Sequence, residues 1–341
     1  MTTYGEALAA GRAALSAAGV ASAATDARLL LAAASKLDMA ALIARGREEL
    51  PAVVGAEFDA HIKRRLGGEP VARILGVKEF WGLPIAVGPA VLVPRPETET
   101  LVETVLVEIK RRFPSDVTIA DLGTGSGAIL IALLSELPGA RGVATDVSEE
   151  ALALARANAE RNGVGRRIAF ECVSFDEGPR GPFDVVVANP PYIKSEAIAG
   201  LEREVRGHDP HAALDGGPDG LTYYRAILQR VDSLLADGGL IGFEVDADQG
   251  EAVTALCRAA GLNEVSVLPD LAGRDRVVTA VATMSAVELE ERKNRLEKFG
   301  GRASFPMQTR VKPQGWASIS GRQTQRSPKA GSLASPSQKT S

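Results

Sequence analysis

The stretch VTIADLGTGSGAILIALLSEL, residues 117–137, decides how this sequence folds. Residues 117–123 are a short apolar run that suits a buried β-strand, and residues 127–137 are an apolar run long enough for a helix. Three glycines at alternate positions, Gly123, Gly125 and Gly127, permit a sharp turn between the two. Because a strand that turns tightly into a helix opens a βα unit, we expect this stretch to lie within a parallel sheet.

The alternation of strands and helices continues to residue 283. Further strands are expected at 140–147, 167–173, 183–191 and 240–246, and helices at 98–112, 148–163, 222–239 and 250–261. NEVSVLPD (263–270) and RVVTAVAT (276–283) follow each other without a helix, so one of them is expected to be an antiparallel edge strand. The sequence therefore predicts an α/β fold, a Rossmann-like seven-stranded mostly parallel sheet with helices on both faces.

Composition divides the chain into four parts. Residues 1–68 are rich in Ala and Leu with helical periodicity, which predicts a small helical domain. Residues 69–93 consist of short apolar runs broken by Gly and Pro, which predicts a β-hairpin linker, and residues 94–283 form the α/β domain. Residues 284–341 begin with a charged helix and are then too poor in apolar side chains to order themselves, so a disordered basic tail is expected.

The formal net charge of −4 is unevenly distributed. Residues 299–341 contain seven Lys and Arg and no acidic residue, which leaves a net charge of −11 on the rest of the chain. An acidic body argues against sequence-blind binding to nucleic-acid backbones, which needs a basic face. The basic tail leaves proximity to RNA or to the ribosome open.

Other features narrow the class of protein. The first residues lack a basic region followed by an apolar run, and no charge-free apolar stretch is as long as a membrane span, so a cytoplasmic protein is expected. Cys172 and Cys257 make neither a disulfide framework nor a zinc spacing. His61, His208 and His211 form no HExxH pattern, and no metal is expected.

A glycine turn and two acids indicate a cofactor site. The turn Gly123-Thr124-Gly125-Ser126-Gly127 follows Asp121 at the carboxyl end of the first parallel strand, where ligands bind in open α/β sheets. Its spacing is not the GxGxxG of nicotinamide-dependent dehydrogenases, which argues against that class. It resembles the first motif of class I S-adenosylmethionine-dependent methyltransferases. Asp146, at the end of the next strand, is placed to accept both hydroxyls of a ribose.

Each of these features also has a structural interpretation. A glycine-rich turn can serve the fold alone. Asp146 also suits the N-cap of the following helix, although Ser148 offers a second N-cap candidate ahead of Glu149 and Glu150. The turn and the two acids together favour cofactor binding over these alternatives.

Asn189-Pro190-Pro191-Tyr192 follows the fourth strand and resembles the (N/D)PP(Y/F) motif of methyltransferases that act on planar nitrogens. An amide or aromatic amino nitrogen is a poor nucleophile because its lone pair is delocalised, so the enzyme must provide acceptors for its two N–H groups. Asn189 Oδ1 and the Pro190 carbonyl can accept one each and favour the charge that develops on the nitrogen. Two prolines stiffen the loop, and Tyr192 can stack on a flat amide or base.

The flanking sequence distinguishes among the possible nitrogens. Residues 68–103, with the hallmark Pro94-Arg95-Pro96-Glu97-Thr98-Glu99, together with residues 208–228 and 270–278, are similar to the release-factor glutamine methyltransferases, the HemK/PrmC family. The resemblance covers about residues 1–283. It implies a class I methyltransferase fold, S-adenosylmethionine as cofactor, and the glutamine of the Gly-Gly-Gln loop of class I peptide release factors as substrate. It further implies that the helical domain helps to dock that partner.

The resemblance also assigns roles to residues. Cofactor contacts are implied for Asp121, Gly123, Thr124, Gly125, Ser126, Gly127, Asp146 and Asn189. The glutamine clamp is implied to be Asn189, Pro190, Pro191 and Tyr192, with Arg95 and Glu97 on the substrate side. Arg95 and Glu97 have the alternative of pairing with each other or capping the helix that starts at Thr98.

The sequence departs from the family at two places. Where the family has a Ser-Asp-Trp-like stretch that brackets the adenine, this chain has Ser174 and Phe175, so either Phe175 covers the adenine or that contact is weaker. Glu244-Val245-Asp246 replaces the family's Glu-x-Gly.

Two other functions remain as alternatives. Methylation of an adenine or guanine amino group would need a basic groove, and a non-catalytic adaptor would not need an intact Asn-Pro-Pro-Tyr.

Overall fold

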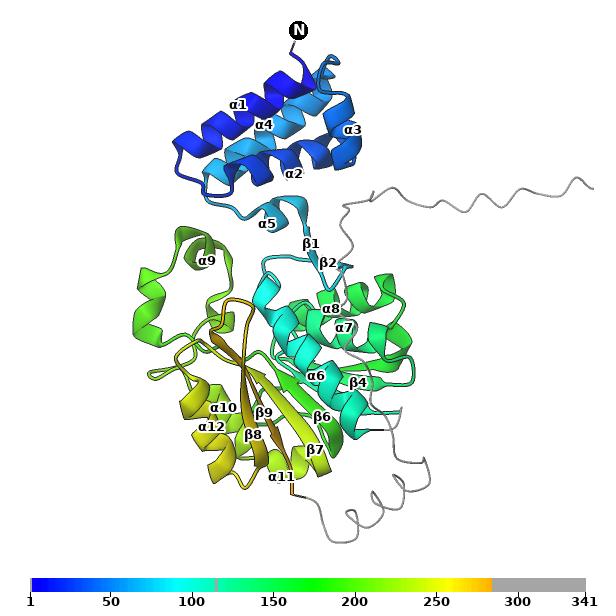
Figure 1. The fold of residues 1–341 in the computed structure, drawn as a ribbon, viewed down its shortest axis with the longest axis vertical. Helices are drawn as coiled ribbons and strands as arrows, with labels where there is room; N and C mark the ends of the chain where they lie inside the picture. The colour runs from blue at the N-terminus through cyan, green and yellow to red at the C-terminus, as the bar shows by residue number, and fades with distance from the viewer. Residues whose placement is uncertain (1, 114–115, 284–341) are drawn as a thin grey trace, which may run out of the picture.

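The computed structural model describes residues 2–113 and 116–283, and the charged helix and disordered tail expected after residue 283 lie outside them. Figure 1 shows a bundle of helices at one end of the molecule and a larger α/β body below it. A short helix and a two-stranded hairpin join the two bodies. Within the described residues, no helix is both long enough and apolar enough to cross a membrane.

The amino-terminal bundle contains the helices that the Ala- and Leu-rich pattern predicts. Their bounds are α1 Tyr4–Ala17, α2 Ala23–Ser35, α3 Met39–Ala44 and α4 Ala52–Leu66. Thr3 and Glu6 form a reciprocal capping box at the start of α1, and Asp38 caps α3 through the Ala41 amide. The bundle encloses a small core of its own around Leu30 and Phe58.

The connection between the bodies differs in part from the expected β-hairpin linker over residues 69–93. Val71–Leu75 forms a helix, α5, which begins after Pro70 and ends at Gly76 in the left-handed conformation. The expected hairpin follows as β1 (Val77–Phe80) and β2 (Leu83–Ala86), paired antiparallel. The buried side chain of Asn158 exchanges hydrogen bonds of 2.8 and 2.9 Å with the backbone of Ala86, which fixes the hairpin to the α/β body.

A seven-stranded sheet forms the centre of the α/β body, in the order β5-β4-β3-β6-β7-β9-β8. The first five strands in this order are parallel, and β9 runs antiparallel to both of its neighbours. This confirms the predicted Rossmann-like, mostly parallel fold. The strands are β3 Thr118–Leu122, β4 Arg141–Asp146, β5 Ile168–Cys172, β6 Phe183–Ala188, β7 Leu235–Glu244, β8 Asn263–Pro269 and β9 Asp275–Val281.

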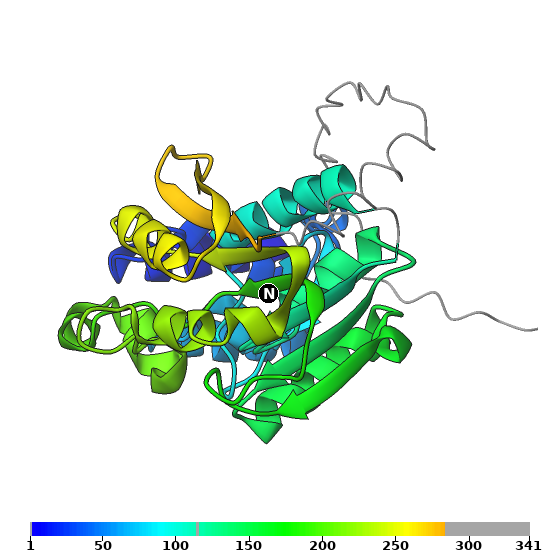
Figure 2. The same cartoon turned by 90° about the horizontal axis from the view of Figure 1, so that it is seen from below.

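Helices cover both faces of the sheet, as Figure 2 shows from below. One core lies between the sheet and α6 (Glu99–Arg112), α7 (Ala128–Glu136) and α8 (Glu149–Arg161). The other lies between the sheet and α10 (Thr222–Leu228), α11 (Val231–Leu234) and α12 (Gly250–Ala259). The short 3-10 helices are η1 Pro96–Thr98, η2 Gly165–Arg167, η3 Ser195–Gly200 and η4 His211–Ala213.

Two details of the α/β body differ from the sequence prediction. The single helix expected over 222–239 is divided into α10 and α11, and β7 already begins at Leu235. The strand that reverses direction, β9, lies inside the sheet between β7 and β8, so the edge is formed by β8. The reversed strand therefore lies directly beside the strand that ends at Glu244.

The segment between β6 and α10 reaches back to the helical bundle. It contains η3, α9 (Arg203–His208) and η4, and Figure 1 shows α9 below the bundle and beside the α/β body. Arg65 of α4 pairs with Asp26 of α2 at 2.7 Å and with Glu204 of α9 at 2.5 Å. Asp209, next to α9, pairs with Arg73 of α5 at 2.7 Å. These ion pairs tie the bundle to the segment that follows Asn-Pro-Pro-Tyr.

Candidate active site

The glycine turn joins β3 to α7 in a conformation that requires glycine. Gly123, Gly125 and Gly127 have φ angles of 71°, 53° and 81°, in the left-handed region that side chains rarely adopt. A Cβ atom on Gly123 would lie 2.6 Å from Cζ of Phe175, which leaves no room for a larger residue. Gly125, in contrast, has open space beside it, at the carboxyl end of β3, where open α/β sheets bind ligands.

Asp121 lies in β3 immediately before this turn and is fully buried. Its Oδ2 accepts a 2.6 Å hydrogen bond from the Thr124 hydroxyl, and its buried Oδ1 has no hydrogen-bond partner. Burial raises the pKa of the Asp121 carboxyl to about 7, against the opposing effect of the Thr124 hydrogen bond. An unpartnered carboxylate oxygen is costly to bury, so Asp121 is suited to meet a donor or a positive charge.

Asp146 ends β4 and supports the turn from the neighbouring strand. Its Oδ2 accepts a 2.9 Å hydrogen bond from the Gly125 amide, and its Oδ1 accepts one of 3.0 Å from the Ser148 amide. Ser148 is the N-cap of α8, since its hydroxyl accepts from the Ala151 amide. Each oxygen of a carboxylate has two acceptor positions, so these bonds leave one on each oxygen of Asp146.

Asn189 follows β6 at the same edge of the sheet. Its Nδ2 donates to the hydroxyl of the buried Thr98 at 3.4 Å. Thr98 belongs to η1, which ends where α6 begins, so the Pro94–Glu99 segment lies against the Asn-Pro-Pro-Tyr segment although 91 residues separate Thr98 from Asn189. With Nδ2 turned toward Thr98, the Oδ1 end of the Asn189 amide is the end left for another partner.

The rest of the motif is packed tightly against the segment 214–220. A Cβ atom on Gly216 would lie 2.7 Å from the carbonyl oxygen of Pro191 and 2.7 Å from Cα of Tyr192. The carbonyl of Tyr192 accepts a 3.0 Å hydrogen bond from the buried side chain of Gln249. Burial raises the pKa of the Tyr192 hydroxyl, so this side chain is a neutral phenol. No hydrogen bond of the described residues ends on the Pro190 carbonyl oxygen.

Phe175 and Ser174 occupy the connection after β5. The Phe175 ring lies against Gly123, as noted above, and its centroid is 4.9 Å from that of Tyr223 at a tilt of 46°. The Ser174 side chain instead hydrogen-bonds Asp176 and lowers the pKa of that carboxyl. Of Ser174 and Phe175, therefore, Phe175 is the residue that lies against the glycine turn.

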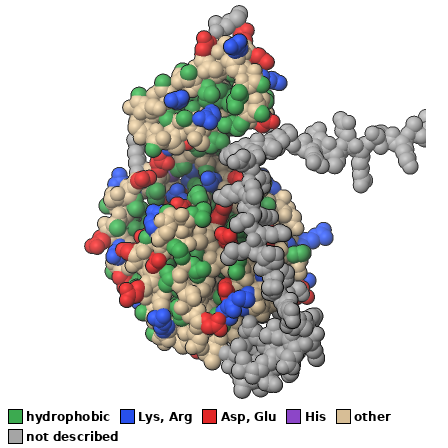
Figure 3. All heavy atoms as spheres, in the orientation of Figure 1, with side chains coloured by type: hydrophobic (Ala, Val, Ile, Leu, Met, Phe, Trp, Pro, Cys, Tyr) green, Lys and Arg blue, Asp and Glu red, His purple; other side chains and the backbone are tan. Residues whose placement is uncertain are grey.

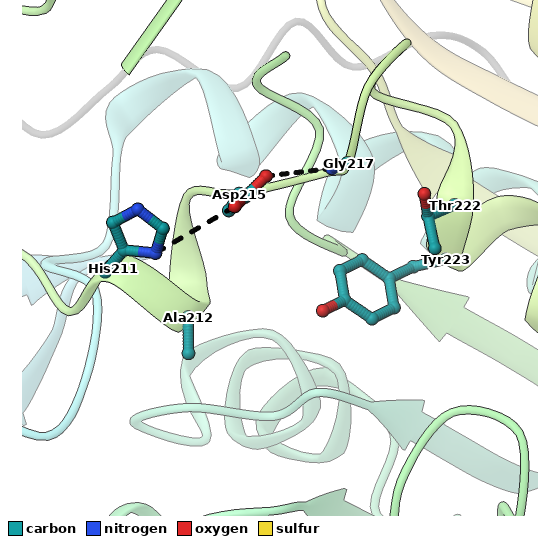
Figure 4. A pocket seen from close by; sticks show the side chains of 6 residues that line it. All are labelled: His211, Ala212, Asp215, Gly217, Thr222 and Tyr223. Carbon is teal, nitrogen blue, oxygen red and sulfur yellow. Dashed lines mark hydrogen bonds and ion pairs between the residues drawn. The ribbon is translucent and has the colours of Figure 1, made fainter. Parts of the chain in front are cut away.

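A depression of about 230 Å³ lies beside the motif and is drawn in Figure 4. The Tyr223 ring extends across it toward Ala212 and His211, and His211 faces Asp215 with 4.0 Å between Nδ1 and Oδ2. Tyr223 also contacts Phe175, so an aromatic pair connects this depression to the glycine turn. Its lining residues are His211, Ala212, Asp215, Gly217, Thr222 and Tyr223.

Arg95 neither caps the helix nor pairs with Glu97 through a salt bridge in the described residues. It makes no side-chain cap hydrogen bond, and its guanidinium pairs with Asp209 at 2.6 Å. The other oxygen of Asp209 pairs with Arg73. α6, the helix that follows Thr98, has no side-chain cap hydrogen bond either, so both structural alternatives given for Arg95 and Glu97 are wrong. Glu97 lies close enough to Glu244 for its charge to raise the pKa of that carboxyl.

Glu244 is a site residue whose role the sequence did not indicate. It ends β7, its side chain is buried, and burial raises the pKa of its carboxyl to about 7. Its carboxyl group interacts with the side chains of Thr98 and Asn189, and its buried Oε2 has no hydrogen-bond partner. The sequence does show Glu244 at the end of a predicted strand. Once that strand is known to neighbour β6, the position of Glu244 places it beside Asn189.

Comparison with known proteins gives consistent matches over most of the chain. Residues 6–76 match the family described as PrmC N-terminal domain, and residues 97–203 match the family described as Methyltransferase small domain. A release factor glutamine methyltransferase of Bradyrhizobium diazoefficiens is 49% identical over 75% of this chain and 86% of the relative. One of Cereibacter sphaeroides is 44% identical over 78% of this chain and 94% of the relative.

Among solved structures, a protein-(glutamine-N5) methyltransferase described as release factor-specific, from Alicyclobacillus acidocaldarius, is 30% identical. The match covers 58% of this chain and 98% of that one, with a TM-score of 0.35. More than 70% of the present chain is aligned with each of these two relatives, and the two family matches lie one on each body of the molecule.

Proposed function

The chain belongs to the release factor glutamine methyltransferase family, and from that premise we propose that it methylates the side-chain amide nitrogen of a glutamine with S-adenosylmethionine. The glutamine is that of the Gly-Gly-Gln loop of class I peptide chain release factors. One observation carries the proposal: Asn189 stands at the carboxyl edge of β6 with Nδ2 directed to Thr98, so that Oδ1 remains as an acceptor.

The residues around the glycine turn fit this cofactor. S-adenosylmethionine supplies an electrophilic methyl group on a positively charged sulfur and also carries an ammonium group. The unpartnered, buried Oδ1 of Asp121 suits a cationic ligand with donors, and the space beside Gly125, where an added Cβ would have no neighbour within 4 Å, admits a close approach to the backbone. Asp146 retains acceptor positions for ribose hydroxyls, and the Phe175 ring beside Gly123 offers a flat apolar face for the adenine.

The substrate amide is held by groups of the chain itself. Asn189 Oδ1 and the Pro190 carbonyl accept the two N–H bonds of the glutamine amide, and Tyr192 packs on its plane. S-adenosylmethionine would supply the methyl group and keep the sulfur's bonding electrons, and these two oxygens would stabilise the positive charge that grows on the glutamine nitrogen. One N–H proton then leaves to water. Orientation contributes most of the rate increase, so no strong base is needed.

The substrate side of the site includes the segment that precedes α6. Arg95 keeps 38% of its side chain exposed while it pairs with Asp209, so its guanidinium can still meet a peptide carbonyl. Glu97 lies near Glu244, so Arg95 and Glu97 together form the substrate-facing wall of the site. Since α9 and α5 connect this wall to the helical bundle, the bundle is placed to dock the body of the release factor.

The test supplies methyl-labelled cofactor to the purified protein together with a release factor, its Gly-Gly-Gln glutamine variant, and ribosomal RNA. Label is expected in the release factor and absent from the glutamine variant. Label that persists in the variant, or that appears only in RNA, refutes the proposed substrate. The second outcome corresponds to methylation of a nucleobase. On the coloured part of the face drawn in Figure 3, Lys and Arg side chains lie among Asp and Glu side chains.

A further inference from the structure

Glu244 and Asn189 are neighbours because of the register between two parallel strands. Ala188 of β6 pairs with Phe243 of β7, so the next residues on each strand, Asn189 and Glu244, emerge side by side at the carboxyl edge of the sheet. Asn189 Nδ2 donates to Thr98 Oγ1 at 3.4 Å, and the Glu244 carboxyl interacts with the side chains of both. Glu244 is 1% exposed and Thr98 is 4% exposed, whereas Asn189 is partly buried, so Asn189 meets two side chains that are shielded from water.

The orientation of an asparagine amide is not determined by its shape. The two ends of the group have nearly the same size, but one donates two hydrogen bonds and the other only accepts. An ionised carboxylate can only accept, so it attracts Nδ2 and repels Oδ1. A carboxylate placed beneath Asn189 therefore selects one of two orientations that packing alone would not distinguish.

We propose that Glu244 is a positioning residue that, together with Thr98, binds the Nδ2 end of Asn189 and so holds Oδ1 toward the substrate nitrogen. The inference rests on the proposed function, because it is this orientation that makes Asn189 an acceptor for the glutamine N–H. In the reverse orientation, Asn189 would present its own N–H groups to the substrate N–H groups, and the clamp would lose one of its two acceptors.

The surroundings of Glu244 give this arrangement a dependence on pH. Burial raises the pKa of its carboxyl to about 7, and the charge of Glu97 adds to this. Arg276 of β9, Thr98 and Asn189 act in the opposite direction. When Glu244 is protonated it can donate to Asn189 Oδ1, which permits the reverse orientation. We therefore expect kcat to rise with pH between about 6 and 8.

The decisive variant is Glu244→Gln, which keeps the shape and removes the charge. With saturating cofactor and release factor, kcat is expected to fall about 10- to 100-fold, the usual loss when a partner that orients a functional group is removed. The KM for release factor and the affinity for cofactor are expected to change by less than about threefold. The rise of kcat between pH 6 and 8 is expected to disappear. Unchanged kcat in Glu244→Gln, or a loss confined to KM, or a pH limb that persists, overturns the inference.

Thr98 tests the same contact from the other side. Thr98→Val removes the hydroxyl and is expected to lower kcat while the pH limb remains, whereas Thr98→Ser keeps the hydroxyl and is expected to restore most of the activity. Glu171→Gln, an exposed acid on the edge strand β5, is the matched control and is expected to behave like the natural protein. Equal activity in Thr98→Val and Thr98→Ser would exclude a role for this hydroxyl.

The cofactor-free protein gives a readout that does not depend on catalysis. In nitrogen-15 spectra, the side-chain NH₂ signals of Asn189 are assigned by their loss in Asn189→Ala. They are expected to shift with pH around 7 in the natural protein and to be insensitive to pH in Glu244→Gln. A signal that ignores pH in both proteins contradicts the inference. If the natural protein fails to label release factor, the proposed function fails, but this spectrum still reports the orientation of Asn189.

Discussion

Individual residues at this site are held in states that a stable core would avoid. Asp121 and Glu244 are both buried carboxyl groups with one oxygen that has no hydrogen-bond partner, and both have a pKa raised to about 7. Such groups cost stability unless a ligand or a neighbour satisfies them. They stand at the carboxyl ends of β3 and β7, on either side of β6 in the sheet. The two groups that cost stability therefore lie on either side of Asn189, at the carboxyl edge of the sheet.

The variant Asp121→Asn is expected to be more stable than the natural protein at pH 8. The folded protein raises the pKa of this carboxyl from 3.8 to about 7, so between these values the folded state holds a proton that the unfolded state has lost. Stability consequently falls as pH rises through this window and stays lower above it. Asparagine cannot ionise, so it avoids this loss, while its amide oxygen still accepts from Thr124.

Thermal melts of the cofactor-free protein provide the measurement. We expect Asp121→Asn to raise Tm at pH 8 by a few degrees, corresponding to about 1–2 kcal/mol. At pH 5 the difference is expected to shrink toward zero. Cofactor affinity, measured by titration calorimetry at pH 8, is expected to fall at least tenfold. A Tm of Asp121→Asn below that of the natural protein at pH 8 would show that ionised Asp121 does not destabilise the folded state.

Asn189→Ala removes the acceptor that the proposed mechanism depends on. We expect kcat for release-factor methylation to fall about 10²- to 10³-fold, the usual loss of one group that stabilises charge in the transition state. The affinity for cofactor is expected to change only a few fold, because the glycine turn, Asp121 and Asp146 remain. Single-turnover transfer and calorimetric titration separate the two effects. A fall in affinity as large as the fall in kcat would assign Asn189 to cofactor binding instead.

The sequence indicated those site residues whose signal is local. The glycine turn, Asp146 and Asn189 each follow directly after an apolar run, so a short window is enough to place them at strand ends. Glu244 also ends a strand, but its meaning depends on which strands are neighbours. The pairing of Arg95 with Asp209 spans 114 residues and could not be read from either local pattern.

At the scale of elements, residues 215–217 run close along the Asn-Pro-Pro-Tyr motif and constrain its position. Ile193 forms an isolated parallel bridge with Asp215, and the Gly216 amide donates to the Ile193 carbonyl at 2.8 Å. The Asp215 side chain accepts from the Ser195 hydroxyl at 2.6 Å and from the Gly217 amide at 2.9 Å. These contacts hold the residues directly after Asn-Pro-Pro-Tyr against residues 215–217.

Gly216→Ala is expected to displace the motif. The added Cβ would lie 2.7 Å from backbone atoms of Pro191 and Tyr192, which cannot move aside as a flexible side chain would. We expect a loss of about 1–3 kcal/mol in unfolding free energy, the usual cost of overpacking, together with a lower kcat. Gly200→Ala is the control, because no atom lies within 4 Å of its added Cβ. Urea melts give the unfolding free energy of the two variants, and activity assays give their kcat. Equal unfolding free energies and equal kcat values would contradict the tight packing at Gly216.

The elements that the sequence misplaced are those whose limits depend on distant partners. The pattern from Thr222 to Gly239 remains apolar and helical, but β7 starts at Leu235 because Leu235 pairs with Phe183 of β6. The β9 strand has the same apolar pattern that a parallel strand would have, and its direction is set by the short turn from β8. Val71–Leu75 is a single helical turn, too short for periodicity to reveal.

At the scale of the whole molecule, one buried carboxylate connects the two bodies to the site. Asp209 is 1% exposed at its side chain and lies between Arg73 of α5 and Arg95 at the start of η1. Arg73 also donates to the carbonyl of Gly88 and, at 2.7 Å, to that of Val91. These contacts hold the linker against Arg95 and Asp209, and the pair of Arg65 in α4 with Glu204 in α9 adds the helical bundle to the same network.

Asp209→Asn tests whether this connection holds the bodies together. The substitution keeps the shape but leaves Arg73, which is 6% exposed, without a countercharge, so the unfolding free energy is expected to fall by about 3 kcal/mol. Asp219→Asn breaks the ion pair with Arg225, in which both side chains are more than 40% exposed, and is expected to cost less than about 1 kcal/mol.

Limited proteolysis should cut Asp209→Asn faster between the bundle and the hairpin, near residues 67–77, while Asp219→Asn is cut at the natural rate. Since α9 and η1 would lose a common anchor, the KM for release factor is expected to rise more than kcat falls. Equal protease resistance and equal stability in the two variants would mean that Asp209 does not couple the helical bundle to the catalytic edge of the sheet.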